Sequence, residues 1–350
     1  MSVFNGFWRL VSDDIGIDLG TANTKVAIAG KGIIATEPSV VALNSTTKEI
    51  LAVGAPAKKM LGRTPANIVA LRPLRDGIIS DFDATRDMIE YFINLAYQKS
   101  EKFIKIPRPR TIIGVPSSAS EIGRKAVYDA AKNAGARDVF VIEEPMAAAI
   151  GSGLPINEAE GSMIVDIGGG TTDIAVISLG GIVVDKTIAV AGDQMDQEIV
   201  KYIRHKYNLL IGERMAEEIK IQIGSAYPLK KEINFEVRGR DLIQGVPRTL
   251  SISSIEVREA ITVELNQIIA AIADALEDSP PEILSDLGSN GIVIAGGGAL
   301  IKGIKDLFEE KLKMKFIIAD NPIECVVKGT QILLEDIDLL AKVKKYYDEY

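Results

Sequence analysis

The sequence predicts an α/β protein of two domains, each built on a mixed β-sheet with helices on both faces. Short apolar strands alternate with amphipathic helices, which is the pattern of a covered sheet. The chain has 350 residues, enough to bury two cores. One acidic, glycine-containing hairpin pattern also occurs in both halves of the chain.

That pattern is clearest at residues 166–173, Asp-Ile-Gly-Gly-Gly-Thr-Thr-Asp, between two short apolar runs. The spacing predicts the tight turn of a β-hairpin. Its glycines allow positive φ and a close approach to a ligand, and its N–H groups and threonine hydroxyls suit a phosphate. Asp166, at the end of the first strand, suits a hydrated Mg²⁺.

A second copy of the pattern lies at residues 18–24, again between two short strands. One glycine turn alone is more often only a hairpin. Two copies facing each other predict a polyphosphate held from both sides, with Asp18 and Asp166 near one metal ion.

Composition limits the partners and the compartment. The net charge of −8 and the lack of a basic run argue against nucleic acid as a partner. The single Cys325 and the single His205 exclude an internal disulfide and a soft-ligand metal site. No uncharged apolar run reaches about 18 residues, so we expect a cytoplasmic protein, with His205 on its surface.

Two apolar segments are candidates for membrane contact. Residues 1–12 have one charged side chain and no cleavage site, so they are not a secretory signal. They could lie in a membrane interface, or fold back over a groove or a partner. Phe103 and Ile104 lie between lysines. They are either the start of a strand that packs inward or an exposed apolar tip that suits an anionic lipid surface. The aromatic residues of the first segment are Phe4, Phe7 and Trp8.

The first half of the chain alternates strands and helices after its hairpin. Residues 37–80 are punctuated by Gly and Pro and predict an irregular excursion. Residues 83–99 carry apolar side chains at helical spacing. The remaining expected elements are an extended segment at 31–41, a strand at 111–115, a serine-capped helix at 117–135, a strand at 138–142 and an alanine-rich helix at 144–151.

Six motifs together resemble, in order, those of the bacterial actin family, specifically MreB. They are residues 18–24, 113–116, 142–149, 166–172, 191–196 and 296–298. The resemblance covers nearly the whole chain, from residue 14 to about 340. It implies an actin-like ATPase fold of two RNase H-like domains, each with an inserted subdomain, with the nucleotide in the interdomain cleft.

The resemblance also implies domain boundaries. Between residues 230 and 250, short extended pieces alternate with turns, which independently indicates a β-rich insertion. The implied parts are an N-terminal segment 1–12, domain I at 13–150 with the C-terminal helix 331–350, its insertion at about 37–80, domain II at 151–330, and its insertion at about 193–248.

By the same resemblance, ATP or ADP with Mg²⁺ is held by both hairpins and by two further segments. After a strand at 292–295, glycines let the backbone approach the nucleotide ahead of a helix N-terminus. Glu217 and Lys220 would hold the ribose and the adenine, or alternatively form a surface ion pair. The expected metal ligands are Asp18 and Asp166, and the expected nucleotide-binding residues are Thr21, Ala22, Asn23, Lys25, Gly168, Gly169, Gly170, Thr171, Arg214, Glu217, Lys220, Gly296, Gly297, Gly298 and Ala299.

Lys25 stands where many relatives have an apolar residue. It could reach a phosphate, as the corresponding lysine does in eukaryotic actin. The alternative is an exposed lysine at a strand end.

The chain departs from the family at the position that supports hydrolysis. MreB proteins place a catalytic glutamate three residues after the Thr or Ser that opens the helix following the Val-Pro turn. Counted from Ser120, that position is Gly123. Glu121 would point about 200° away around the helix, which leaves Glu144 and Thr172 to orient water. We therefore expect ATP binding with slow hydrolysis, because a positioned base contributes about 10²- to 10⁴-fold in rate.

The implied function is that of an ATP-binding, filament-forming cytoskeletal protein that determines cell shape at the inner face of the membrane. Its subunits would stack head to tail into paired protofilaments, with other cytoskeletal proteins as possible partners. One alternative is a structural filament subunit that uses nucleotide only as a conformational ligand. Another is an ATPase of the wider superfamily, but we find neither the substrate-binding β domain of a heat-shock chaperone nor the catalytic Asp and sugar pocket of a sugar kinase.

Overall fold

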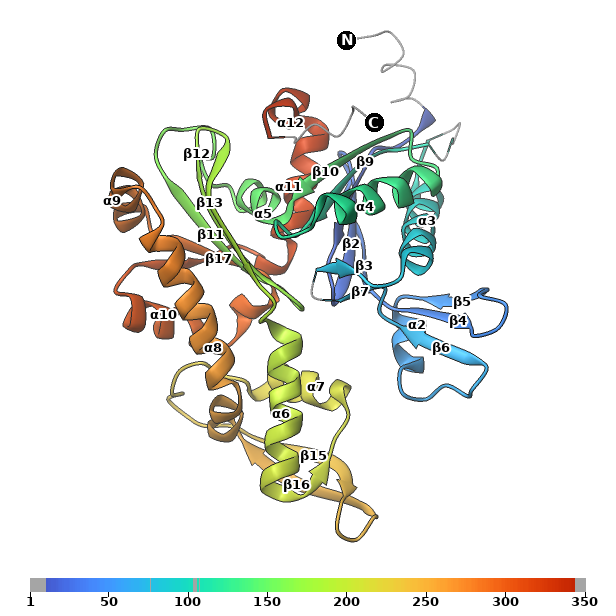
Figure 1. Cartoon of the computed structure of the whole chain (residues 1–350), viewed down its shortest axis with the longest axis vertical. Helices are drawn as coiled ribbons and strands as arrows, with labels where there is room; N and C mark the ends of the chain where they lie inside the picture. Colours follow the sequence, from blue (N-terminus) through green and yellow to red (C-terminus); the bar gives the residue numbers. More distant parts are fainter. Residues whose placement is uncertain (1–10, 76, 103–105, 107, 344–350) are drawn as a thin grey trace. The chain divides into compact units, whose positions relative to one another are not determined.

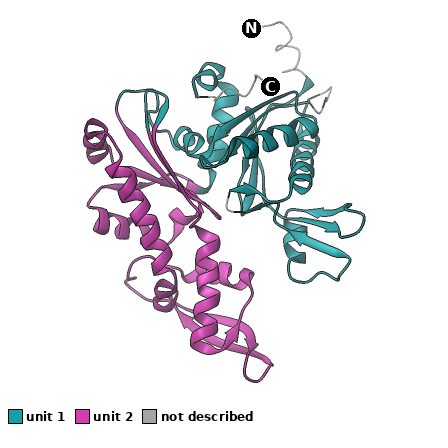
Figure 2. Cartoon of the chain, in the orientation of Figure 1, with its two compact units in different colours: residues 1–159, 177–182, 323–350 teal, residues 160–176, 183–322 magenta. Residues whose placement is uncertain are grey.

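The computed structural model describes residues 11–75, 77–102, 106 and 108–343. The chain forms two compact units (Figure 2). Unit 1 comprises Met1–Ala159, Ile177–Ile182 and Ile323–Tyr350, and unit 2 comprises Glu160–Val176 and Val183–Pro322. Among the helices described, none combines the length and apolar character needed to cross a membrane.

Unit 1 contains a five-stranded mixed sheet in the order β10-β9-β1-β2-β3 (Figure 1). β1 is antiparallel to β2 and parallel to β9, and β9 is parallel to β10. The strands are β1 (Ile15–Leu19), β2 (Asn23–Ile28), β3 (Gly32–Pro38), β9 (Arg110–Val115) and β10 (Asp138–Glu143).

Helices cover both faces of this sheet, as the sequence predicts. Alternate residues of a strand face opposite sides, so Ile15 and Ile17 of β1 face a core shared with α3 (Phe82–Lys99) and α4 (Glu121–Asn133). On the opposite face, a Cβ at Gly16 would lie 2.3 Å from Thr330 Oγ1, which shows how closely α11 (Cys325–Glu335) packs there.

The packing of α5 (Glu144–Gly151) against α11 holds the C-terminal part of the chain in unit 1. A Cβ at Gly151 would lie 1.9 Å from the Cys325 carbonyl oxygen, and one at Gly329 would lie 1.8 Å from that of Ala147. Glycine at both positions lets the helix backbones touch. The unit boundary at residue 323 therefore precedes the expected boundary at 330.

The expected C-terminal helix is two helices. α11 ends at Glu335, and α12 (Ile337–Val343) begins after Asp336. Asp336 has an extended conformation, with φ −109° and ψ 92°, and its carboxylate accepts a hydrogen bond from Leu339 N at 2.9 Å. This aspartate therefore ends one helix and caps the next.

A small insertion leaves the main sheet of unit 1 within the expected excursion. Its three strands are ordered β5-β4-β6, and Val40, Ala42 and Ala57 form a small core of their own. The elements are β4 (Val41–Asn44), β5 (Ile50–Val53), α2 (Ala55–Met60), β6 (Ile68–Leu71), β7 (Leu74–Arg75) and β8 (Ile78–Ile79).

Unit 2 is built on a second five-stranded sheet, in the order β13-β12-β11-β17-β18. β17 runs parallel to both of its neighbours. The strands are β11 (Ser162–Ile167), β12 (Thr172–Ser178), β13 (Gly181–Ile188), β17 (Ile292–Ala295) and β18 (Phe316–Ile318), and the helices packed with them include α8 (Ser254–Glu277), α9 (Pro281–Asn290) and α10 (Ile304–Leu312).

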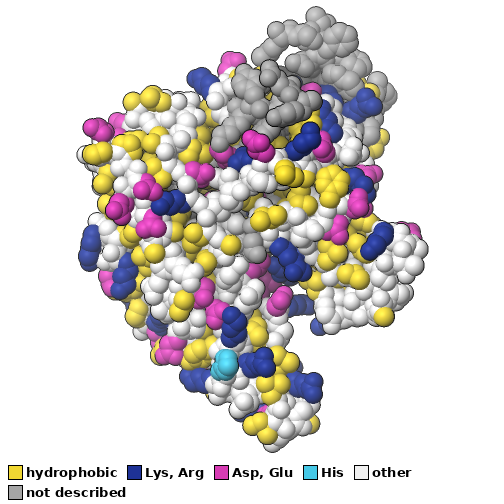
Figure 3. All heavy atoms as spheres, in the orientation of Figure 1, with side chains coloured by type: hydrophobic (Ala, Val, Ile, Leu, Met, Phe, Trp, Pro, Cys, Tyr) yellow, Lys and Arg dark blue, Asp and Glu magenta, His cyan; other side chains and the backbone are white. Residues whose placement is uncertain are grey.

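The insertion of unit 2 is the β-rich segment that the sequence predicts between residues 230 and 250. Its sheet has the order β14-β15-β16. Its elements are β14 (Leu209–Leu210), β15 (Asn234–Asp241) and β16 (Pro247–Ser253), next to α6 (Gly192–Tyr207) and α7 (Glu213–Ile223). His205 on α6 is exposed (Figure 3), as expected.

Candidate functional site

The first acidic hairpin joins β1 to β2 in unit 1, as predicted. Asp18 lies opposite Lys25 in the antiparallel pairing. Gly20 does not adopt positive φ; glycine is needed because a Cβ would lie 2.7 Å from the Asn23 carbonyl oxygen. Ser39, which the sequence analysis missed, donates its hydroxyl to the Gly20 carbonyl at 2.5 Å and lies 2.8 Å from Thr24 Oγ1. The turn that carries Thr21, Ala22 and Asn23 is therefore held by Ser39, the residue directly after β3.

Three parallel strands of unit 1 end at the same edge of the sheet. Asp18 and Ile142 both lie opposite Gly114. Glu144 follows directly at the start of α5, and its Cγ would lie 3.3 Å from a Cβ at Gly114. Ligands of open α/β sheets bind outside the carboxyl ends of strands. The structure therefore brings the predicted Asp18 and the predicted Glu144 to one such edge.

Lys25 is not an exposed lysine, so that alternative is wrong. Its side chain is 10% exposed, and its Nζ donates to Asp18 Oδ2 at 2.6 Å. A Mg²⁺ ion bound directly to Asp18 does not fit this arrangement, because an ammonium already holds that carboxylate. Within the described residues, no group of three or more His, Cys, Asp or Glu side chains is placed to hold a metal ion.

The second acidic hairpin joins β11 to β12 in unit 2, also as predicted. Gly168 N donates to the Thr171 carbonyl at 2.9 Å and closes the turn. The expectation of positive φ is wrong in this hairpin, since Gly168, Gly169 and Gly170 all lie outside the left-handed region. The first N–H groups of α6 hold the loop: Gly192 N donates to Gly168 O at 3.3 Å, and Asp193 N donates to Gly169 O at 2.7 Å. These donors have no partner within their own helix, so the loop satisfies them.

Thr172 has a structural role in this hairpin. It is fully buried, and its hydroxyl donates to the Val190 carbonyl at 2.7 Å. Because its only proton is engaged, its suitability for orienting water is reduced. Glu144 is therefore the better of the two predicted candidates.

The predicted glycine turn after β17 lies against the second hairpin. β11 and β17 are parallel and place Asp166 opposite Ala295. Gly296 has φ 78°, and a Cβ there would lie 2.3 Å from Asp166 Oδ1. The turn itself forms a short 3-10 helix, Gly297–Leu300, and α10 begins only at Ile304. The expected helix with Ile304, Leu307 and Phe308 facing inward is α10, because Ile304 and Phe308 are fully buried and Leu307 packs against the same core. The backbone of the turn approaches Asp166 closely.

The predicted adenosine-binding helix α7 is tied to the start of α6. Lys220 Nζ donates to Gly192 O at 2.7 Å and to Asp196 Oδ2 at 2.8 Å. Burial raises the pKa of Asp196 to about 6, although Lys220 opposes this rise. The hairpin of Asp166, the start of α6 and Lys220 are therefore one connected group in unit 2, whereas Arg214 is exposed.

The position of the missing glutamate lies in the first turn of α4. This helix begins at Glu121 rather than at Ser117, because Ser120 Oγ accepts a hydrogen bond from Gly123 N at 3.1 Å and caps it. A Cβ at Gly123 would meet only Ser120 Oγ, at 3.4 Å. The site therefore has room for a side chain.

Arg124, which the sequence analysis also missed, fixes the start of α4. Its guanidinium lies 3.1 Å from Glu143 Oε1 at the end of β10. It also donates to the carbonyl oxygens of Ser117 and Ala119, at 2.8 and 3.0 Å. The segment before Gly123 is thus anchored to the same sheet edge that carries Asp18.

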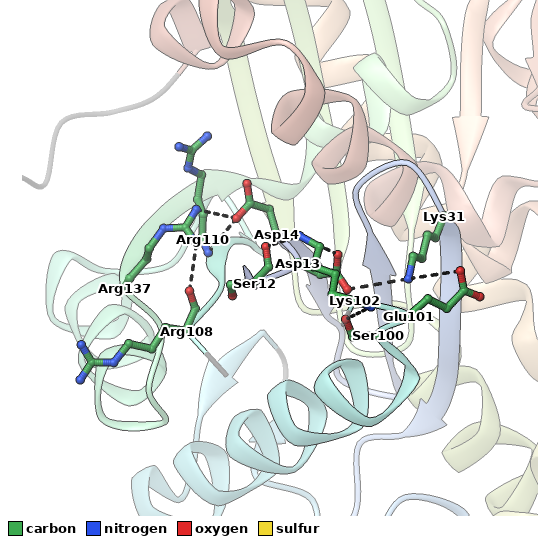
Figure 4. Close-up of polar contacts among 10 residues, drawn as sticks. All are labelled: Ser12, Asp13, Asp14, Lys31, Ser100, Glu101, Lys102, Arg108, Arg110 and Arg137. Atoms are coloured by element: carbon green, nitrogen blue, oxygen red, sulfur yellow. Dashed lines mark hydrogen bonds and ion pairs between the residues drawn. The ribbon is translucent and has the colours of Figure 1, made fainter. Parts of the chain in front are cut away.

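A second polar cluster lies at the opposite edge of this sheet, where the parallel strands begin (Figure 4). Arg137 Nη2 donates to Asp14 Oδ1 at 2.6 Å. Lys102 Nζ donates to Ser12 O at 2.7 Å and lies 3.2 Å from Asp13 Oδ1. The cluster ties residues 12–14 to the segment that begins at residue 100. The candidate membrane residues Phe4, Phe7, Trp8, Phe103 and Ile104 lie outside the described residues.

The two covered mixed sheets, each with an acidic glycine hairpin, define an actin-like protein. The chain matches the MreB/Mbl protein family over residues 12–342, and it belongs to this family.

Proteins named for cell-shape determination are close relatives. The chain is 48% identical over 329 residues to the cell shape-determining protein Mbl of Bacillus cereus, covering 94% of this chain and 98% of that protein. It is also 48% identical to the cell shape-determining protein MreB of Escherichia coli K12, covering 95% of this chain and 96% of that protein.

Solved structures agree with the fold. The crystal structure of MreB5 of Spiroplasma citri bound to ADP is 36% identical, with a TM-score of 0.88, covering 95% of this chain and 98% of that one. The MamK double helical filament is 25% identical, with a TM-score of 0.78, covering 93% of this chain and 99% of that one.

Proposed function

We propose that this protein binds ATP and ADP through its two acidic hairpins and assembles head to tail into filaments that act in determining cell shape. The observation that carries the proposal is the connected group in unit 2. There the Asp166 hairpin is held by the start of α6 and meets the Gly296 turn. Glycine backbone next to an acidic hairpin suits a phosphate chain. The solved MreB5 structures with ADP and with AMPPNP and the MamK filament support the assignment.

In this proposal the residues have distinct roles. Thr171 and the backbone of residues 168–170 contact phosphates, and Glu217 and Arg214 on α7 lie near the nucleoside. Lys220 positions the hairpin through Gly192 rather than pairing along its own helix. Glu144 orients the attacking water, and hydrolysis is slow because Gly123 offers no carboxylate.

Assembly is expected to depend on nucleotide. ATP and AMPPNP should send the protein into the pellet on high-speed sedimentation, and ADP less so, with filaments visible by electron microscopy. Thr171→Val removes a hydroxyl without changing side-chain shape and should raise the ATP concentration needed for half-maximal pelleting by about 10-fold or more, since a hydrogen bond to a charged group contributes about 1.5 kcal/mol or more.

Thr262→Val, at an exposed position on α8, is the matched control and should behave as wild type. Equal pelleting with all nucleotides and with none would favour the structural subunit that does not need nucleotide. No pelleting under any condition would contradict the filament proposal.

We further propose that the protein lies at the inner face of the cell membrane. Support comes from the charge cluster of Figure 4, which joins two segments that lead to apolar residues. Ile106 N donates to Val11 O at 2.7 Å, and Lys102 bonds to Ser12. The last residues of the N-terminal apolar segment thus lie beside those that flank Phe103 and Ile104. Two weak apolar anchors bind a surface far better than one.

Vesicle binding is expected to need both apolar segments. Replacing Phe103 and Ile104 by serine should lower the fraction bound to anionic vesicles by about 10-fold or more, because about 0.8 kcal/mol is lost for each buried CH₂. Leu179→Ser, at a site 73% exposed, is the control and should bind as wild type. Unchanged flotation of the double serine variant would contradict the proposal.

A further inference from the structure

Lys25 and Asp18 form a buried pair within the first hairpin. They are direct cross-strand neighbours, so both side chains point to the same face of the sheet. Their charged atoms are 2.6 Å apart, with side chains 10% and 6% exposed. This carboxylate therefore has a cation supplied by its own hairpin.

The surroundings hold this pair in place. The Ser39 hydroxyl binds both the Gly20 carbonyl and the Thr24 hydroxyl, and Gly77 N donates to Thr21 Oγ1 at 3.3 Å. Both ends of the hairpin turn are thus braced by other parts of unit 1. The ammonium is presented from a strand rather than from a mobile loop.

We propose that Lys25 is a tethered cation that supplies at Asp18 the positive charge a divalent ion would otherwise supply, so that nucleotide binding by this protein depends only weakly on Mg²⁺. This inference rests on the proposed nucleotide binding. The ligand class is a nucleoside di- or triphosphate. An ammonium has three N–H donors, so one group can hold the carboxylate and a phosphate oxygen together.

A metal ion and this ammonium compete at Asp18. Direct coordination would require Mg²⁺ to displace a buried ammonium, and two cations on one carboxylate repel each other at this distance. Mg²⁺ also gives up its waters reluctantly. The ammonium, already in place, needs no such dehydration step when the nucleotide arrives.

The test is calorimetric titration of the full chain with ADP, once in excess Mg²⁺ and once in excess EDTA. For wild type we expect the Kd to change by about 5-fold or less. Lys25→Met keeps the stem without the charge and should bind about 100-fold more weakly in EDTA than in Mg²⁺. Both values lie within the usual range of coupling between two ligands. Lys25→Arg keeps a cation and should resemble wild type, and Lys305→Met, an exposed control, should not differ from it.

The outcomes separate this inference from the proposed function. A wild-type Kd about 100-fold weaker in EDTA would overturn the tethered cation while leaving nucleotide binding intact. No heat in either buffer would overturn nucleotide binding, and this inference with it. Should Lys25→Met fail to fold by circular dichroism, the wild-type pair of titrations and Lys25→Arg still decide the matter.

Discussion

Gly123→Glu is expected to accelerate ATP hydrolysis by about 10²- to 10⁴-fold, the usual contribution of a positioned general base. The new side chain fits, because a Cβ at this position meets only Ser120 Oγ, at 3.4 Å. The position is also the third residue of α4 after its serine cap. The carboxylate would return to the place at which MreB proteins are expected to carry their base.

Gly123→Gln is the control for this prediction. Glutamine has the same shape and can complete the same capping box with Ser120, but it cannot accept a proton from water. Single-turnover phosphate release should therefore rise for the glutamate variant alone. Release that is equally fast in wild type and Gly123→Glu would contradict the assignment of Gly123 as the lost base.

Arg124→Met is expected to destabilise unit 1 by about 3–5 kcal/mol, the usual cost of removing one partner of a buried ion pair. Arg124 is 7% exposed on its side chain and Glu143 is 9% exposed. The change also removes donors to the Ser117 and Ala119 carbonyl oxygens. The loop before α4 would lose its anchor. Adding Arg124→Met to Gly123→Glu should therefore also lower the rate of ATP hydrolysis.

Arg86→Met is the matched control, because Arg86 forms ion pairs with Asp83 and Asp87 on the more exposed side of α3. Exposed pairs contribute about 1 kcal/mol or less. Scanning calorimetry should show a clearly lower unfolding temperature for Arg124→Met. Arg86→Met should leave the unfolding temperature almost unchanged. Equal shifts in the two variants would show that the Arg124 contacts are no more stabilising than surface pairs.

Local patterns in the sequence were sufficient to predict several of the elements. The helix at residues 83–99 was predicted from its apolar spacing, and Met88, Ile89, Phe92, Ile93 and Ala96 are all buried. Both acidic hairpins were predicted from the change between apolar runs and glycine turns. These features depend on neighbours along the chain, which is why one sequence reveals them.

Contacts between distant segments could not be predicted in the same way. Gly151 and Gly329 are separated by all of unit 2 in sequence, and their contacts decide that α11 belongs to unit 1. Arg124 and Glu143 meet only because β9 and β10 are parallel neighbours. Ser39 braces a turn formed almost 20 residues earlier, at Gly20.

The pairing of Lys25 with Asp18 was within reach of the sequence. A hairpin with its turn at residues 20–23 places these two residues directly opposite each other, and opposite charges across strands attract. From the sequence, Lys25 was instead assigned to a phosphate or to an exposed strand end, and Asp18 was assigned to a metal ion separately. The strand register connects the two assignments.

The central claim is that this actin-like chain binds nucleotide through its acidic hairpins. Calorimetric titration of the wild-type protein with ADP tests it most directly. We predict heat that saturates at one ADP per chain and that is diminished in Thr171→Val. The absence of any heat of binding, with the protein folded by circular dichroism, would contradict the claim.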